Sequence, residues 1–99
     1  MTATTLAEDD SVIRIPTRFD FRLAQDFDRA AGKAVGRVNS EIVIDLSKAA
    51  YIDSSGLGML LVLRDSARAS GKSVVLQGAS GAVRDVLGIA NFHKIFAFR

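Results

Sequence analysis

The chain has 99 residues, 48% of them hydrophobic and 24% charged, a composition typical of one globular domain with a single core. Thirteen basic against eleven acidic side chains give a net charge of +2, which is too small for the electrostatic footprint of a nucleic-acid-binding protein. The chain has no cysteine and one histidine, His93, so the usual zinc sites are excluded and we expect no metal or cofactor.

No segment of the sequence predicts contact with a membrane. The longest apolar run, Met59 to Leu63, is far shorter than a membrane span. The first ten residues are acidic and lack the basic and apolar regions of a secretory signal. We therefore expect a cytoplasmic protein.

The first half of the chain predicts a strand followed by a helix. Residues 1–10 predict a flexible or weakly ordered arm, or a weak edge strand. A short strand is predicted over residues 11–16, and Pro16 ends it or places it at a sheet edge. Residues 17–21 predict a loop, with Asp20 near the start of an amphipathic helix of about four turns. The apolar face of that helix holds Leu23, Phe27, Ala30, Ala31, Ala34 and Val38.

The second half continues the alternation. A buried strand is predicted over residues 41–46, and a helix after residue 53 whose first turns are buried all round and which Gly71 closes. A strand over residues 73–77 follows. Ser80 is the expected cap of the last helix, which Asn91 ends. The remaining apolar residues, Ile95, Phe96 and Phe98, predict a terminal strand or a tail lying on the core.

This order of elements predicts an α/β fold. Strands alternate with helices along the chain, which is typical of one sheet that is mostly parallel in its middle and has helices packed against it. We expect residues 11–99 to form this single domain.

The segment Asp53-Ser54-Ser55-Gly56-Leu57-Gly58 is the most informative part of the sequence. It lies where a strand passes into a helix, and in open α/β sheets sites tend to be built at such places. A serine there can accept hydrogen bonds from the first free amides of the helix, and the glycines allow a sharp turn. Spacing alone favours this structural interpretation over a functional site.

Two catalytic interpretations of the segment fit poorly. A serine hydrolase would have glycine two residues before its nucleophile, but Asp53 stands there relative to Ser55 and Ile52 relative to Ser54. His93 is the only imidazole, and nothing in the sequence places it beside a serine. A P-loop is excluded because its closing lysine-serine/threonine pair is missing. We therefore expect a protein that is not an enzyme.

A third interpretation makes a serine the substrate of another protein. A phosphoryl group adds about −1.5 to −2 charge units and three acceptor oxygens. At a helix N-terminus the free amides and the helix dipole tolerate this charge, so the fold should survive. A partner that had packed on a neutral hydroxyl would instead meet a bulky dianion beside Asp53.

The pattern of residues 42–46 (Ile-Val-Ile-Asp-Leu) followed by 51–58 (Tyr-Ile-Asp-Ser-Ser-Gly-Leu-Gly) resembles the STAS-domain anti-sigma factor antagonists. Residues 83–87 and 92–96 resemble that family's last helix and closing strand, so the resemblance covers almost the whole chain. It implies a four- or five-stranded mixed sheet with helices mainly on one face. It also implies that Ser54 is phosphorylated by a partner serine kinase that is itself the anti-sigma factor, and that a PP2C-type phosphatase reverses the reaction.

The resemblance further implies a docking surface made of residues 54–58 and the region of Asp20. Its expected members are Asp20, Asp53, Ser55, Gly56, Leu57 and Gly58, with Ser55 the rival phosphoacceptor. Phe19 and Phe21 flank Asp20, and either both are core residues or one is an exposed anchor. Arg64 and Arg68 lie one turn apart and face either an acidic partner or solvent.

One departure from the family widens the choice of partners. Many members carry Gly-Glu-Leu-Asp before the first helix, where this chain has Thr-Arg-Phe-Asp-Phe at residues 17–21. This looks similar to a subgroup controlled by composite kinase–phosphatase regulators in bacterial biofilm, motility or secretion control. The alternative function is a STAS-like sensor or scaffold that binds a small anionic ligand or nucleotide at residues 54–58 without a phosphorylation cycle.

Overall fold

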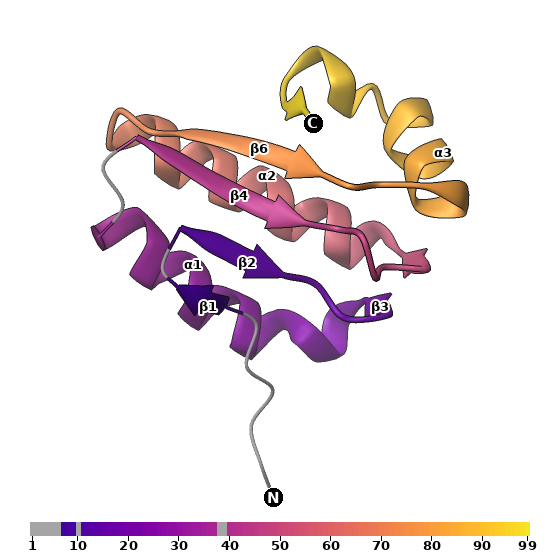
Figure 1. The fold of residues 1–99 in the computed structure, drawn as a ribbon, viewed down its shortest axis with the longest axis horizontal. Helices are drawn as coiled ribbons and strands as arrows, with labels where there is room; N and C mark the ends of the chain where they lie inside the picture. Colours follow the sequence, from indigo (N-terminus) through magenta and orange to yellow (C-terminus); the bar gives the residue numbers. More distant parts are fainter. Residues whose placement is uncertain (1–6, 10, 38–39) are drawn as a thin grey trace, which may run out of the picture.

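A five-stranded mixed sheet forms the centre of the protein. The structure, a computed structural model, describes residues 7–9, 11–37 and 40–99. The strand order is β1-β2-β4-β6-β7; β1 pairs with β2 antiparallel, and the other pairs are parallel (Figure 1). This confirms the predicted α/β fold and mixed sheet. The strands are β1 (Ala7–Asp9), β2 (Val12–Arg14), β4 (Glu41–Asp45), β6 (Ser73–Gln77) and β7 (Ala97–Phe98).

Of the predicted N-terminal arm, residues 1–6 and 10 lie outside the described residues, and residues 7–9 form the edge strand β1. Because β1 pairs with β2 at the edge of the sheet, β2, the strand that precedes Pro16, is not an edge strand.

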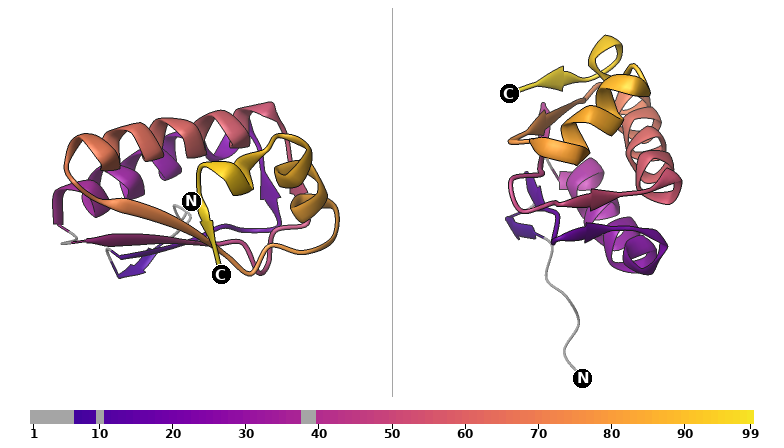
Figure 2. Two further views of the ribbon diagram at one scale, coloured as in Figure 1. Left: turned by 90° about the horizontal axis from the view of Figure 1, so that it is seen from above. Right: turned by 90° about the vertical axis from the view of Figure 1, so that its right-hand side faces the viewer.

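Two long helices cover one face of the sheet. Figure 2 shows α1 (Ala24–Arg37) and α2 (Ser54–Ala69) on the same side of the strands. The shorter α3 (Gly81–Ile89) contacts the short strand β5 (Tyr51–Ile52), which lies outside the five-stranded sheet. One-turn 3-10 helices precede α1 (η1, Phe21–Leu23) and β7 (η2, Phe92–Lys94). The predicted four-turn helix corresponds to η1 and α1, and its last residue, Val38, lies outside the described residues.

The core lies between this face and the helices. Ile42 and Ile44 of β4 are fully buried, whereas Val43 between them is half-buried, so β4 has one core face and one open face. Opposite them α1 and α2 contribute their apolar stripes. The core residues contributed by β2, β4, β6, α1, α2 and the turn of 3-10 helix before α1 are Ile13, Leu23, Phe27, Ala34, Ile42, Ile44, Leu60, Leu63, Ala67, Val74 and Leu76.

On the open face, Asp45 closes β4 with a charged contact. Its carboxylate accepts hydrogen bonds from Arg14 Nη1 at 2.8 Å and from the Ser47 amide at 3.0 Å. Burial by itself would raise the pKa of Asp45, but the hydrogen bonds from Ser47 and the Arg14 guanidinium outweigh it and hold that pKa below its ordinary value of 3.8.

The ends of the helices lie close to the expected residues, with one exception in the capping. Gly71, at φ +73°, follows Ser70, the C-cap of α2. Asn91, at φ +63°, follows Ala90, the C-cap of α3, and is the N-cap of η2, so α3 ends slightly before the predicted residue. Ser80 precedes α3 as expected, but its side chain makes no capping hydrogen bond.

The structure also contains two short strands that the sequence did not predict. Arg18–Phe19 (β3) pairs parallel with Tyr51–Ile52 (β5) and makes a separate two-stranded sheet. Residues 17–21 are therefore not simply a loop. Two residues are too few to show the alternation by which a strand is recognised.

Candidate functional site

The pairing of β3 with β5 brings together two segments that lie about thirty residues apart in the sequence. Beyond the strand register, the Thr17 carbonyl accepts hydrogen bonds from the amides of Ala50 and Tyr51, at 2.8 and 3.1 Å. The amide of Asp53 donates to the Phe19 carbonyl at 3.3 Å. The start of α1 and the start of α2 therefore lie side by side, next to the carboxyl ends of the parallel strands (Figure 1).

Asp53 is the N-cap of α2. Its carboxylate accepts a hydrogen bond from the Gly56 amide at 3.0 Å, and its carbonyl accepts the first helical bond from Leu57 at 3.0 Å. Asp53 itself is extended, as an N-cap should be. The interpretation of the segment as a serine cap is therefore wrong: the aspartate caps the helix and leaves both serine side chains for other uses.

Ser54 and Ser55 are the first two residues of α2, and their exposure differs. Ser54 is exposed and Ser55 is half-buried. Within the described residues, neither hydroxyl takes part in a hydrogen bond. Because Gly56 and Leu57 donate to Asp53, the amides of Ser54 and Ser55 are the two at the helix start that no described group accepts. An accessible hydroxyl thus stands at the positive end of a sixteen-residue helix.

The next three residues have different environments. Gly56 is buried, and a Cβ there would lie 2.6 Å from the Phe19 carbonyl oxygen and 2.8 Å from Ile52 Cγ1. Leu57 is half-buried and packs against the core. A Cβ on Gly58 would meet nothing within 4 Å. Gly56 thus allows close contact of α2 with β3, while Gly58 offers open surface.

Asp20 caps η1 and has little surface of its own. Its side chain accepts hydrogen bonds from the Arg22 amide at 3.0 Å and from Arg18 Nε at 3.3 Å, and the residue is 5% exposed. The two phenylalanines that flank Asp20 differ in exposure. Phe19 is completely buried and Phe21 is 65% exposed, so the alternative with one exposed phenylalanine is the one the structure shows.

The two arginines of α2 and the single histidine were also singled out in the sequence, and their environments differ. The Arg64 side chain is 23% exposed and its Nε donates to the Ile95 carbonyl at 2.9 Å, so it ties α2 to the C-terminal segment; Arg68 is exposed. His93 is exposed in η2.

Within residues 7–9, 11–37 and 40–99, no group of three histidine, cysteine or acidic residues is arranged to hold a metal ion. No helix of that part of the chain has the length and hydropathy needed to cross a bilayer.

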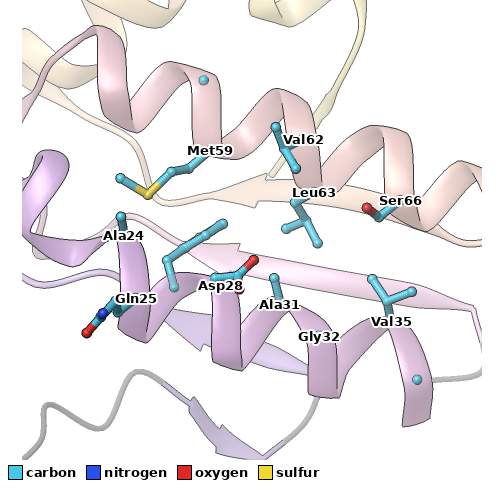
Figure 3. Close-up of a pocket in the computed structure, with 13 residues that line it drawn as sticks. Ala24, Gln25, Asp28, Ala31, Gly32, Val35, Met59, Val62, Leu63 and Ser66 are labelled. Carbon is cyan, nitrogen blue, oxygen red and sulfur yellow. The ribbon is translucent and has the colours of Figure 1, made fainter.

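Sequence reasoning missed a groove between α1 and α2. It has a volume of about 900 Å³ and an apolar lining, and Figure 3 shows side chains of both helices facing it. Gly58 and Met59 line it at the end nearest Ser54, and Ser66 lines it two turns later. The sequence predicted that the first turns of α2 are buried all round, but Leu61 and Val62 are 38% and 64% exposed. The packing of α1 against α2 therefore leaves apolar side chains of α2, among them Val62 in the groove, open to solvent.

Two comparisons with known proteins agree on the family. The family model described as "Mlab, STAS domain" matches residues 2–97. The STAS-domain containing protein PA14_20770 of Pseudomonas aeruginosa is 45% identical over 84 residues, which cover 85% of this chain and 82% of that protein.

Solved structures share the fold. TM1081 of Thermotoga maritima, described as a candidate anti-sigma factor antagonist, superimposes with a TM-score of 0.76 at 24% identity and covers 91% of this chain and 80% of its own. The anti-sigma factor antagonist SpoIIAA in its unphosphorylated form gives a TM-score of 0.69 at 20% identity, over 89% of this chain and 76% of its own.

Proposed function

The chain belongs to the STAS domain family, and on that premise we propose that it is a phosphorylation-switched binding protein of the anti-sigma factor antagonist type. In its unphosphorylated form it binds a serine kinase that is also the anti-sigma factor, and so releases the client of that kinase. Phosphorylation of Ser54 ends the binding. The observation that carries the proposal is the exposed hydroxyl of Ser54 at the start of α2, directly after the capping Asp53; this hydroxyl forms no hydrogen bond with the part of the chain that the structure describes.

The choice of Ser54 over Ser55 rests on exposure. A kinase must bring the γ-phosphoryl group of ATP in line with the attacking hydroxyl, which a half-buried side chain hinders. Ser54 is exposed and Ser55 is half-buried. The similar fold of SpoIIAA, an anti-sigma factor antagonist described in its unphosphorylated form, supports a phosphorylation switch in general, and the choice between the two serines rests on their exposure.

The switch acts through charge at the docking surface. A phosphoryl group on Ser54 places about −1.5 to −2 charge units beside the Asp53 carboxylate. The amides at the helix start and the helix dipole stabilise that charge, so folding changes little. The partner, by contrast, must approach two neighbouring anionic groups where it had met one. Phe21, exposed next to Asp20, the cap of η1, supplies an apolar contact on the same surface.

In this account the chain is the substrate of its partners and not a catalyst. It needs no cofactor, and its kinase works in the cytoplasm, where ATP is present. A PP2C-type phosphatase or a composite kinase–phosphatase regulator removes the phosphoryl group and restores binding. The net charge of +5 over residues 11–99, from 13 basic and 8 acidic side chains, favours an acidic partner surface.

The test uses the kinase purified from the native host by its ability to phosphorylate this protein. Ser54→Ala should bind that kinase as the wild type does and accept no phosphoryl group. Ser54→Asp should bind about tenfold more weakly, equivalent to about 1.4 kcal/mol, because a carboxylate carries only part of the charge of a phosphate. Ser55→Ala is the matched control and should be phosphorylated normally.

Equal binding of the alanine and aspartate variants would overturn the electrostatic account. Saturable nucleotide binding by the isolated protein, unaffected by Ser54→Ala, would instead favour a ligand-binding domain. Both variants should keep the thermal stability of the wild type, because Asp53 and not Ser54 caps the helix.

A further inference from the structure

The groove between α1 and α2 has an unusual composition for a helix surface. Three helical glycines line it, Gly32 and Gly36 on α1 and Gly58 on α2, and a Cβ on any of them would meet nothing within 4 Å. Glycine destabilises a helix interior relative to alanine, and here no contact within the described residues requires its small size. Without side chains at these positions, another backbone can approach both helices closely.

The groove continues the proposed docking surface. Gly58 belongs to both, since it lies one helical turn after Ser54 and also lines the groove. From Gly58 to Ser66 the groove follows α2 for about 12 Å, at about 1.5 Å per residue. Val62, 64% exposed, stands between them on the same wall. A partner seated at Ser54 therefore has an apolar channel leading away from it that accommodates two to three turns of helix.

One charged side chain lies in the groove and indicates the chemistry of its occupant. Asp28 is exposed and has no ion pair within the described residues, whereas its neighbour Asp26 lies 3.7 Å from Arg29. Figure 3 shows the Asp28 side chain extending from α1 into the space between the helices. An unpaired carboxylate beside apolar walls favours an occupant with a positive charge and disfavours a fatty acid or an anionic lipid.

We propose that this groove binds an amphipathic helix of the serine kinase. The apolar face of that helix lies against Met59 and Val62, and a lysine or arginine on it pairs with Asp28. Gly32 and Gly58 let the helix axes come close. This inference rests on the proposed function, because the kinase that acts on Ser54 is the partner that supplies the helix.

The test measures the affinity of groove variants for the purified kinase defined by Ser54 phosphorylation. Gly32→Leu, which fills the groove, and Asp28→Lys, which reverses its charge, should each raise the Kd by about tenfold or more. Lys33→Leu, on the adjoining position outside the groove lining, and Asp85→Lys on α3 are the matched controls and should bind normally.

A second variant separates binding from folding. Gly32→Ala should raise the Tm by about 4–8 °C, since it replaces an unneeded helical glycine, and should still weaken kinase binding. If Gly32 were instead needed for the fold, Gly32→Ala would lower both the Tm and the affinity for the kinase.

The outcomes also separate the two proposals. A kinase that phosphorylates Ser54 and binds all groove variants like the wild type would overturn the groove assignment alone. Loss of a dimer of this chain in the variants, with unchanged kinase binding, would also overturn it and make a second copy the occupant. If no host kinase phosphorylates Ser54, the proposed function fails and the groove assignment fails with it.

Discussion

Gly56 is the residue at which the fold and the candidate site depend on one another most closely. In the Gly56→Ala variant the new Cβ would lie 2.6 Å from the Phe19 carbonyl oxygen, 2.8 Å from Ile52 Cγ1 and 3.1 Å from Phe19 Cγ. The carbonyl cannot simply turn away, because it accepts the hydrogen bond from the Asp53 amide. The methyl group must therefore push the start of α2 away from β3.

The expected cost follows from two opposing effects. Forcing an extra methyl group into a packed site costs about 1–3 kcal/mol. Replacing a helical glycine by alanine returns about 1 kcal/mol. We expect Gly56→Ala to lower the free energy of unfolding by up to about 2 kcal/mol after both effects. Gly58→Ala, two residues further on, meets no atom within 4 Å and should instead gain up to about 1 kcal/mol.

Urea denaturation of the two variants and the wild type, followed by circular dichroism, measures this difference directly. The two glycines differ in surroundings but share helix and chemistry, so the comparison isolates the close approach to Phe19. Gly56→Ala should also slow phosphorylation of Ser54, since it separates the two halves of the docking surface. Equal stability of the two alanine variants would refute the reasoning.

Three further predictions concern single side chains. Asp53→Ala should lower the free energy of unfolding by about 1 kcal/mol in a urea titration, because it removes the cap on Gly56, while Asp53→Asn keeps most of it. Asp45, whose pKa is lowered by Ser47 and Arg14 against the effect of burial, stabilises the fold above its unfolded-state pKa; this part of the stability is lost as the pH falls through the lower folded-state pKa. Asp45→Asn should therefore show a smaller loss of stability on acidification below about pH 4, and an unchanged pH profile would contradict the assignment. Phe21→Ala should weaken kinase binding with little change in Tm, and a Tm loss as large as that of a buried phenylalanine would show that Phe21 is part of the core.

The sequence predicted those elements that carry a clear apolar period. The stripe of Phe27 and Ala34 predicted α1, and the β-branched runs around Ile42 and Val74 predicted the central strands, because each buries one face over enough residues for the pattern to repeat. The residue pattern predicted a helix after residue 53, and Ser54 is observed as its first residue.

The missed features depend on contacts between distant segments. The pairing of Phe19 with Ile52 involves strands of two residues, which carry no period. The buried state of Asp20 and the exposure of Phe21 follow from where β3 ends, so neither could be predicted from local pattern. The groove exists only because α1 and α2 lie together, and the open surface of Val62 depends on that packing.

The most direct test of the central claim is peptide mass spectrometry of the protein purified from its native host over several growth conditions, before and after phosphatase treatment. Cleavage after Lys48 and Arg64 releases residues 49–64 as one peptide that holds both serines. The account predicts one phosphatase-sensitive phosphoryl group, placed by fragmentation on Ser54. A phosphoryl group on Ser55, or an unmodified peptide under every condition including incubation with host extract and ATP, would contradict it.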